Sequence, residues 1–302
     1  MARLTILCLV CLSILSLSSA GKNSCKRPKK IRSVFLKPQS CDCDSKTSGL
    51  LKYEDGQVLF CNGNDWKSLM TSVGSMENPG SSCKDIKERS PTEPTNGVYW
   101  IITGSQGAIP VYCDMKAGGW TMVFKYVNDT KQDAYEVYNS ADTYSENQME
   151  ALDVTKAYPD IYKNKIVLKW SSFDPSEARV ALYKGGSLVK ELMFDAKGTD
   201  KLNWFAKSKL TGTLPWNDIE KETTNYFAIE GDPGNNRRFF INRSYGGCPN
   251  DMGWMVVSKA GCEWEKAFGE YVILYSNKDT YVPWQQELDN VAEADVIAVF
   301  VR

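Results

Sequence analysis

The chain has 302 residues, a net charge of −1, 42% apolar and 24% charged residues, ten cysteines and no histidine. The length suffices for one large domain or two smaller ones, and the apolar content excludes a disordered chain. The balanced charge gives no general reason to expect nucleic acid as a partner. The lack of histidine excludes Ser-His-Asp and Cys-His catalysis and imidazole-bound zinc, but not carboxylate chemistry, cysteine chemistry or calcium sites.

Residues 1–20 are typical of a secretory signal peptide. Arg3 precedes an apolar run from Leu4 to Leu17, and the small residues that follow predict cleavage after Ala20. The apolar run is short for a bilayer span, and no later stretch is apolar and long enough to be one, so we expect no membrane span. The sequence therefore predicts a secreted, extracellular protein.

Eight cysteines follow the predicted signal peptide, and an even number in an exported chain indicates disulfides rather than metal thiolates. Spacing alone leaves their pairing open, although a bond between Cys41 and Cys43 is the least expected because its loop is too tight. The eight are Cys25, Cys41, Cys43, Cys61, Cys83, Cys113, Cys248 and Cys262. Two sequons, at Asn128 and Asn242, are candidate N-glycosylation sites in this compartment, unless either is buried or unused.

The stretch 21–80 reads as an N-terminal segment in three parts. Residues 21–40 are basic, which is typical of a solvated tail; binding to an anionic polymer or trimming after Lys30 are the alternatives. Residues 41–70 predict a small hairpin stapled by cystines, with strands at 50–53 and 57–60 around the turn signal Asp55-Gly56. Residues 71–82 are rich in Ser, Gly, Asn and Pro and predict a linker.

Residues 81–302 predict one continuous β-rich domain of the α+β class. Strands are expected at 97–102, 108–113, 120–124, 166–170, 179–183, 188–194, 225–230, 238–242, 254–257, 271–275 and 296–301. A β-turn is expected at Asp232-Pro233-Gly234-Asn235. Short helices are expected after a capping box at Thr143 and after a cap at Thr199.

Part of this domain resembles the opening of a fibrinogen C-terminal-type domain. The motifs that carry the resemblance are Cys83-Lys84-Asp85-Ile86, Asn96-Gly97-Val98-Tyr99-Trp100-Ile101, Val111-Tyr112-Cys113-Asp114-Met115 and Gly118-Gly119-Trp120-Thr121. The resemblance implies a short helix after Cys83, a Cys83–Cys113 disulfide and a second cystine between Cys248 and Cys262. It leaves the other four cysteines to the N-terminal segment.

The resemblance fades between residues 125 and 240, and the usual Trp-x-x-Trp ending is absent. The runs 245–254, 262–265 and 271–276 are instead similar to a divergent branch found in secreted proteins of corals and other cnidarians, including proteins of the skeletal organic matrix. This similarity implies an extracellular matrix role associated with calcification. It supplies no mechanism.

The binding sites of the fibrinogen-type family are only partly matched by residues of this sequence. Its calcium-binding Asp-x-Asp motif is absent before Cys248, and the acidic residues near Asp232 are better explained by the turn, so we expect no metal site and no cofactor. Lectin-like members bind acetylated sugars beside the second cystine among aromatic side chains. Here Trp254, Trp264 and Tyr271 are candidate ligand-binding residues, with burial in the core as the favoured alternative.

No nucleophile, phosphate-binding loop or dinucleotide motif indicates an enzyme. Carboxylate pairs such as Glu263 and Glu265 are explained as well by a solvated surface. We therefore expect a secreted, disulfide-braced glycoprotein that binds extracellular matrix components or a mineral surface in the organic matrix of a calcified skeleton. The alternative is a soluble carbohydrate-binding protein whose partners are glycans.

Overall fold

The computed structural model describes residues 41–54, 57–68, 72–104, 107–155 and 161–302. The predicted signal peptide, the basic tail, Cys25 and the Asp55-Gly56 turn lie outside these residues. The chain divides into two compact units between Ser72 and Val73. No helix in the described ranges is long and apolar enough to cross a membrane.

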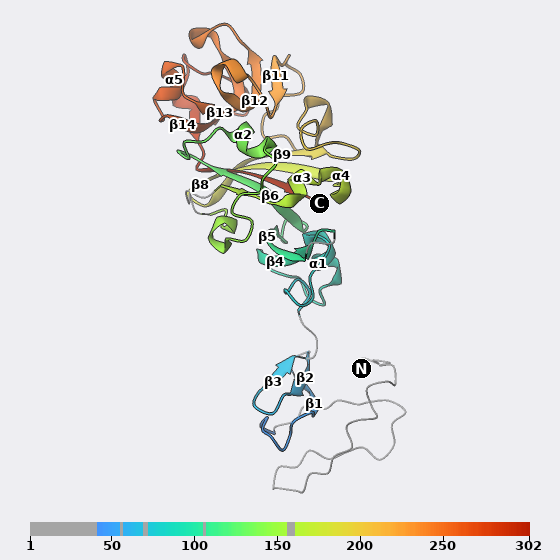
Figure 1. The fold of residues 1–302 in the computed structure, drawn as a ribbon. Helices are drawn as coiled ribbons and strands as arrows, with labels where there is room; N and C mark the ends of the chain where they lie inside the picture. The colour runs from blue at the N-terminus through green and yellow to red at the C-terminus, as the bar shows by residue number, and fades with distance from the viewer. Residues whose placement is uncertain (1–40, 55–56, 69–71, 105–106, 156–160) are drawn as a thin grey trace. The chain divides into compact units, whose positions relative to one another are not determined.

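Unit 1 contains a three-stranded antiparallel sheet in the order β1-β2-β3 (Figure 1). Its strands are β1 (Leu51–Glu54), β2 (Gln57–Cys61) and β3 (Trp66–Ser68). The β1–β2 pair is the hairpin that the alternation on each side of Asp55-Gly56 predicts. A disulfide between Cys43 and Cys61 and a hydrogen bond from Trp66 Nε1 to the Cys41 carbonyl (3.0 Å) fix the preceding loop to this sheet.

Unit 2 is built around an eight-stranded sheet in the order β10-β9-β8-β17-β6-β5-β4, with β7 paired to β6. Strands β6 and β17 are buried along their whole length because the sheet is covered on both faces, and their sequences are accordingly mostly apolar. The strands are β4 (Gly97–Ile102), β5 (Ala108–Asp114), β6 (Trp120–Val127), β7 (Tyr162–Lys163), β8 (Glu177–Lys184), β9 (Ser187–Asp195), β10 (Leu210–Thr211) and β17 (Val296–Val301).

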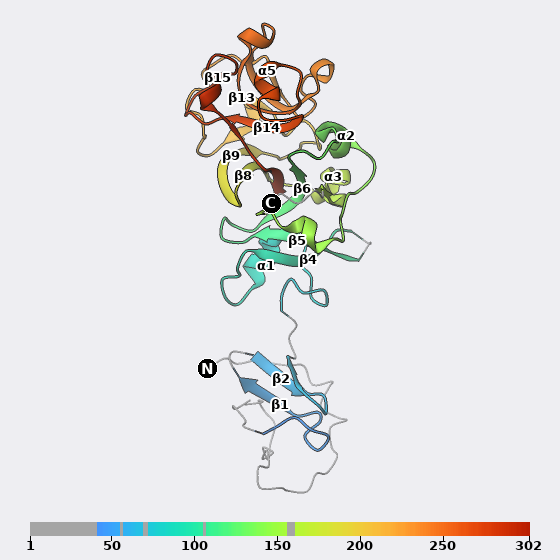
Figure 2. The same cartoon turned by 90° about the vertical axis from the view of Figure 1, so that its left-hand side faces the viewer.

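A second, six-stranded antiparallel sheet forms the other end of unit 2 from β4 and β5 (Figures 1 and 2). Its order is β11-β12-β13-β14-β16, and β15 pairs with β13. The strands are β11 (Tyr226–Ala228), β12 (Arg237–Ser244), β13 (Met252–Lys259), β14 (Tyr271–Ser276), β15 (Val282–Pro283) and β16 (Val291–Glu293). Aromatic and branched side chains of both sheets meet in one core cluster.

The helices of unit 2 are short. α1 packs against β6, α2 against β12 and α3 against β6. The α-helices are α1 (Cys83–Arg89), α2 (Ala134–Asn139), α3 (Lys165–Leu168), α4 (Trp170–Phe173) and α5 (Glu263–Lys266), and the 3-10 helices are η1 (Met149–Leu152), η2 (Lys207–Lys209), η3 (Pro233–Asn235), η4 (Cys248–Asn250) and η5 (Leu288–Asn290). The prediction of a β-rich α+β fold is confirmed.

Helix α1 approaches β6 so closely that only glycine fits at the start of the strand. Gly119 has φ +80°, and a Cβ there would lie 2.8 Å from the Cα of Lys84. The helix begins at Cys83 because Ser82 caps it by accepting from the Asp85 amide at 3.1 Å. The Gly118-Gly119 motif thus allows the contact that places Cys83 beside β5.

The boundary between the units precedes the expected one at residue 80. The Trp100 amide donates to the Gly74 carbonyl (2.7 Å), and the Gly80 amide donates to the Trp100 carbonyl (3.1 Å). These bonds attach residues 74–80 to the free edge of β4. The polar composition that indicated a linker belongs in part to this edge segment.

The strand predicted at 166–170 is wrong, since α3 and α4 occupy these residues. The buried Asn164 caps α3 by accepting from the Ile166 amide at 3.0 Å, while its Nδ2 donates to the Met122 carbonyl at 3.1 Å. This cap and its contact with β6 outweigh the strand propensity of Ile166 and Val167.

The two predicted short helices also differ from the structure. Tyr144 is extended and pairs with Lys163, and Glu146 accepts from the Lys165 amide instead of closing a capping box; only the 3-10 helix η1 follows. Residues 199–206 form turns, because the Asp200 carboxylate accepts from the Leu202 and Asn203 amides.

Candidate functional site

Three disulfides cross-brace the described residues. The structure joins Cys83 to Cys113 and Cys248 to Cys262, the two pairs that the fibrinogen-type resemblance implies. It also joins Cys43 to Cys61, a pairing that the sequence left open. Cys41 is a free cysteine within the described ranges. In unit 2 the bonds attach α1 to β5 and the η4 loop to the start of α5.

Two of the three candidate ligand-binding aromatics lie in the core. Trp254 is 0% exposed and its Nε1 donates to Asp218 Oδ1 at 2.8 Å. Trp264 is 2% exposed and stacks on Trp284 with 5.0 Å between ring centroids. Neither ring presents a face to a ligand, so the candidate role of these tryptophans is wrong and the core alternative holds. Tyr271 is half-buried at the start of β14.

The two sequons differ in accessibility. Asn242 is fully buried on β12, and its Nδ2 donates to the Ser244 carbonyl at 2.9 Å, so this fold has no room for a glycan there. Asn128 is half-buried after β6, and its Nδ2 donates to Glu293 Oε1 at 2.6 Å. Glycosylation of Asn128 requires that bond to open.

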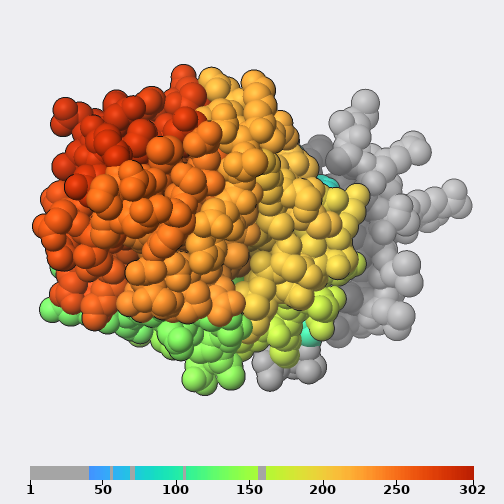
Figure 3. All heavy atoms as spheres, turned by 90° about the horizontal axis from the view of Figure 1, so that it is seen from above, coloured from blue at the N-terminus to red at the C-terminus, as the bar shows by residue number. Residues whose placement is uncertain are grey.

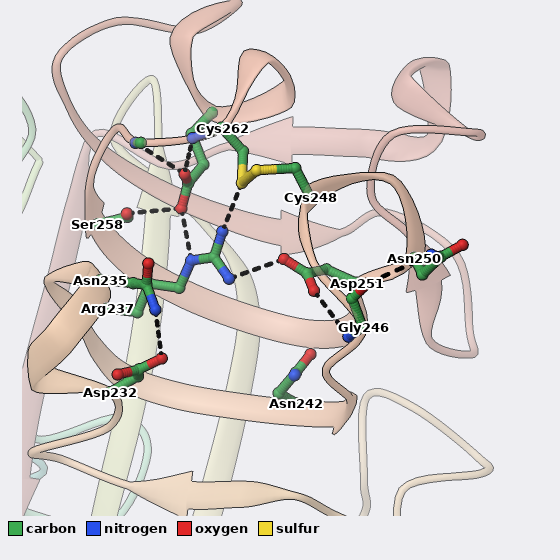
Figure 4. Close-up of polar contacts among 12 residues, drawn as sticks. Asp232, Asn235, Arg237, Asn242, Gly246, Cys248, Asn250, Asp251, Ser258 and Cys262 are labelled. Carbon is green, nitrogen blue, oxygen red and sulfur yellow. Dashed lines mark hydrogen bonds and ion pairs between the residues drawn. A yellow bond between two sulfur atoms is a disulfide. The ribbon is translucent and has the colours of Figure 1, made fainter.

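A buried ionic cluster lies beside the second cystine (Figure 4). The guanidinium of Arg237, on β12, is 1% exposed. It donates to Asp251 Oδ2 and Glu265 Oε1 at 2.8 Å each, and to the sulfur of Cys262 at 3.1 Å. Burial alone would lower the pKa of Arg237, but bonds to Glu265 and then Asp251 outweigh it and raise the pKa. The guanidinium therefore stays charged.

The carboxylate of Glu265 is held by further donors. Its Oε2 accepts from the amides of Gly261 (2.9 Å) and Cys262 (2.7 Å), and its Oε1 accepts from Ser258 Oγ (2.7 Å). The Arg237 guanidinium also lies 5.0 Å from the ring centroid of Trp264. With every charged group paired and hydrogen-bonded, this Arg237 cluster is a structural support for the cystine loop.

The acidic residues near Asp232 form the predicted turn. The Asp232 carboxylate accepts from the Gly234 amide (3.0 Å) and from Asn235 Nδ2 (2.8 Å). Burial acts to raise the pKa of Asp232, but the bonds from Asn235 and Tyr245 outweigh it and lower the pKa. Among the residues that the structure describes, no three His, Cys, Asp or Glu side chains group as a metal site.

A cavity of about 200 Å³ lined by both polar and apolar residues lies beside Tyr271, and we call it the Tyr271 pocket. It is enclosed by the end of β6, the start of α2 and strands β12 to β14. In Figure 3 the green segment that carries α2 runs along the edge of the orange and red residues of this sheet. The lining residues are Tyr126, Gln132, Asp133, Ala134, Asn236, Arg238, Val257, Ser258, Lys259 and Tyr271.

Two cations and a fixed loop define this pocket. Arg238 is 6% exposed, so its charge is buried in the lining of the pocket. Lys259 is exposed, so its charge is in contact with solvent. Burial raises the pKa of Tyr126 to about 12, so its hydroxyl stays protonated and donates to the Gln132 carbonyl at 2.7 Å. The pocket therefore combines the ion pair between Arg238 and Asp133 (2.8 Å), an exposed lysine, neutral polar groups and an aromatic ring.

Sequence reasoning found Tyr271 but missed Arg237, Arg238 and Lys259. The available signal was Arg238 at the start of the strand predicted at 238–242, with Arg237 directly before it, because charges in a buried strand need partners. Nothing in the local sequence connects them to Asp133 or Glu265.

Part of the chain is similar in sequence to a domain of known matrix proteins. A model of the fibrillar collagen C-terminal domain matches residues 62–167, from just before β3 into α3. Part of the chain is therefore similar to an extracellular matrix type of domain.

Individual relatives agree with this class. The collagen alpha-2(I) chain of Oryctolagus cuniculus is 36% identical over 69 residues, which are 22% of this chain and 13% of that collagen. The collagen alpha-2(I) chain of Rattus norvegicus is 33% identical over 86 residues, 28% of this chain and 6% of that collagen. The chain thus spans a small part of the collagens it matches. Among solved structures, the fibrinogen-like globe domain of human ANGPTL6 aligns with a TM-score of 0.37 at 12% identity, covering 78% of this chain and 98% of that domain.

Proposed function

We propose that this chain is a secreted extracellular matrix protein with a structural or adhesive role and that it is not an enzyme. The observation that carries the proposal is the similarity of residues 62–167 to the fibrillar collagen C-terminal domain. The signal peptide predicted at 1–20 supports export.

The disulfides support the same role. Bonds that enclose loops of 14 to 30 residues each stabilise a domain by roughly 3–4 kcal/mol in the loop-entropy model. Such bonds persist in oxidising compartments outside the cell. A domain braced in this way presents a fixed surface to its surroundings, which suits repeated weak contacts in a matrix.

We extend the proposal to the organic matrix of a calcified skeleton, on the basis of the similarity of the regions around Cys248, Cys262 and Tyr271 to secreted cnidarian proteins. The partners would be other matrix components or the mineral surface. Single surface carboxylates bind calcium weakly, so contact with mineral would use many of the 37 acidic residues at once.

Localisation tests this proposal directly. We expect an antibody against the chain to stain the extracellular matrix, and to detect the protein in extracts obtained after the mineral is dissolved. Mass mapping of that material should find Cys83, Cys113, Cys248 and Cys262 without free thiols. Staining confined to the cell interior, or free thiols at these four positions in secreted protein, contradicts the proposal.

A soluble carbohydrate-binding protein is the second candidate, and the Tyr271 pocket is the observation that favours it. Trp254 and Trp264 are buried, so the informative variant for glycan binding is Tyr271→Ala. A glycan array on which the wild type binds and Tyr271→Ala does not would favour this candidate. Extraction only from the soluble fraction would favour it over the matrix role.

A further inference from the structure

The turn between β2 and β3 of unit 1 brings together the groups that convert an asparagine side chain into a carboxylate. We propose that Asn62 is a site of spontaneous deamidation, in which the amide nitrogen of Gly63 is the nucleophile and water is the only co-reactant. The backbone amides of Asn64 and Asp65 promote the reaction. The proposal goes beyond the matrix role and does not depend on it.

The reaction is balanced with water alone. Hydroxide takes the proton of the Gly63 amide, and the nitrogen attacks Asn62 Cγ. The side-chain nitrogen takes a proton from water and leaves as ammonia, which regenerates the hydroxide and closes a succinimide ring. A second water opens the ring and returns a proton to the Gly63 nitrogen. Opening at the side-chain carbonyl gives aspartate, and opening at the main-chain carbonyl gives isoaspartate; nothing is oxidised or reduced.

The side-chain carbonyl of Asn62 lies in an oxyanion hole. Its Oδ1 accepts from the amides of Asn64 and Asp65, at 2.9 Å each. When the Gly63 nitrogen attacks, negative charge develops on this oxygen. Both distances fall within the range of about 2.7–3.1 Å in which fixed donors stabilise such a charge. The donors belong to the backbone, so they are in position before the reaction begins.

The nucleophile is an unhindered backbone amide. Gly63 has φ +101°, and apart from its chain neighbours only Ser48 lies within 4 Å of where a Cβ would be. The hydrogen bond that closes the turn runs from the Asn62 amide to the Asp65 carbonyl, at 3.2 Å. Within the part of the chain that the structure describes, the Gly63 amide donates no hydrogen bond. Its nitrogen is therefore available to attack.

The turn is open to the water that both steps need. Residues 62–65 are exposed, except for the half-buried Gly63. The turn is nevertheless fixed at its ends, because Cys61 and Trp66 pair across β2 and β3. A fixed turn keeps the oxyanion hole assembled while solvent reaches the reacting atoms, which lowers the entropy cost of the attack.

A second Asn-Gly pair in the same chain provides an internal comparison. Asn96-Gly97 is the only other occurrence of this dipeptide in the sequence. Asn96 is exposed as well, and its Oδ1 accepts from the amide of Lys116 at 2.8 Å. Gly97, however, is the first residue of β4 and pairs with Cys113 of β5. The sheet holds the Gly97 backbone, so we expect Asn96 to react much more slowly.

Deamidation would change unit 1 in two ways. Either product places a carboxylate near Asp65, whose own carboxylate pairs with Lys67 at 3.5 Å. Isoaspartate also lengthens the backbone between Cys61 and Trp66, next to the Cys43–Cys61 disulfide. The charge and the backbone of this turn therefore change with the age of the molecule.

The test follows both asparagines in the full-length secreted protein. The protein is incubated in neutral buffer for increasing times and digested, and mass spectrometry measures the deamidated fraction at each site. We expect Asn62 to react at least about tenfold faster than Asn96 in the folded protein. In the reduced chain in urea, the two rates should agree within about threefold, because the fold no longer distinguishes them. Equal rates in the folded protein, or a folded Asn62 that reacts more slowly than the unfolded one, overturn the proposal.

Variants of Asn64 test the oxyanion hole itself. Asn64→Pro removes one of the two N–H donors, and the rate at Asn62 should fall at least about tenfold. Asn64→Ala keeps the donor and is the matched control, with a rate within about twofold of the wild type. An unchanged rate in Asn64→Pro, with the Cys43–Cys61 bond intact, overturns the proposal. If Asn64→Pro does not fold, the comparison of folded and unfolded wild type decides.

Discussion

Arg237 Nη2 donates a hydrogen bond to the disulfide sulfur of Cys262 at 3.1 Å, so the buried charge of unit 2 touches its second cystine. The same guanidinium binds Asp251, which follows η4, and Glu265, on α5. One cation therefore connects the two segments that the disulfide also joins. The charge cluster and the covalent bond support the same loop.

Removal of this cation should be strongly destabilising. In Arg237→Met, Asp251 and Glu265 stay buried without a counter-charge, and we expect a loss of about 3–5 kcal/mol in the free energy of unfolding. Urea denaturation measures this loss. Arg243→Met is the matched control, because Arg243 is partly exposed and pairs with Glu222; its loss should stay below about 1 kcal/mol. Similar losses in both variants would contradict the structural role of the cluster.

Contact between Arg237 and Cys262 also predicts non-additive effects. A double-mutant cycle that combines Arg237→Met with Cys248→Ala/Cys262→Ala should give a coupling energy of about 1 kcal/mol or more, since the two sites share a contact. The same cycle with Cys83→Ala/Cys113→Ala should be additive within about 0.5 kcal/mol, because that disulfide lies in another part of unit 2. Additivity in both cycles would show that the cluster and the cystine act independently.

The strand framework could be predicted well from the sequence. The strands predicted at 120–124 and 296–301 are β6 and β17, in the centre of the larger sheet. Errors arose where a polar contact distant in sequence decides the local structure. Asn164 turns the branched residues of α3 into a helix because its side chain binds the Met122 carbonyl.

The candidate site was less predictable than the strands, because it too depends on contacts between residues that are distant in sequence. Tyr271 was identified, but its pocket brings together segments near residues 130, 237, 258 and 271 through strand pairing. Trp254 and Trp264 matched the composition of a binding surface, whereas the alternation of β13 directs Trp254 into the core and Trp264 stacks on Trp284. Composition indicated the right region without showing which side chains face a cavity.

The difference between the two sequons gives a chemical prediction. We expect peptide mass mapping of secreted protein to find no glycan on Asn242, since its amide is buried and bound to the Ser244 carbonyl. Any N-glycan should be on Asn128, and Asn128→Gln should then remove the whole mass increment. Asn242→Gln should leave that increment unchanged but lower stability, because the longer side chain does not fit β12. A glycan on Asn242 would contradict the register of β12.

The buried ammonium of Lys163 predicts how stability depends on pH. Burial, helped by repulsion from Lys201 and opposed by Asp142, lowers the pKa of Lys163 from 10.5 to about 8. Its Nζ donates to the carbonyls of Val137 (2.9 Å) and Ser140 (2.8 Å). Between pH 8 and 10.5 the unfolded chain binds more protons at this lysine than the folded chain, so the free energy of unfolding rises with pH in this window.

The expected rise between pH 7.5 and 9.5 is roughly 1–2 kcal/mol, measured by urea denaturation at several pH values. Measurements stop below pH 10, where the buried tyrosines begin to contribute in the opposite direction: their raised folded pKa values favour the folded state only while they remain protonated. Lys163→Met should remove most of the rise, since burial also lowers the pKa of Lys190, and Lys259→Met, which removes an exposed lysine, should retain it. A flat profile in the wild type, or a rise that survives in Lys163→Met, would mean that Lys163 keeps its proton in the folded protein throughout this range, held by the carbonyls of Val137 and Ser140.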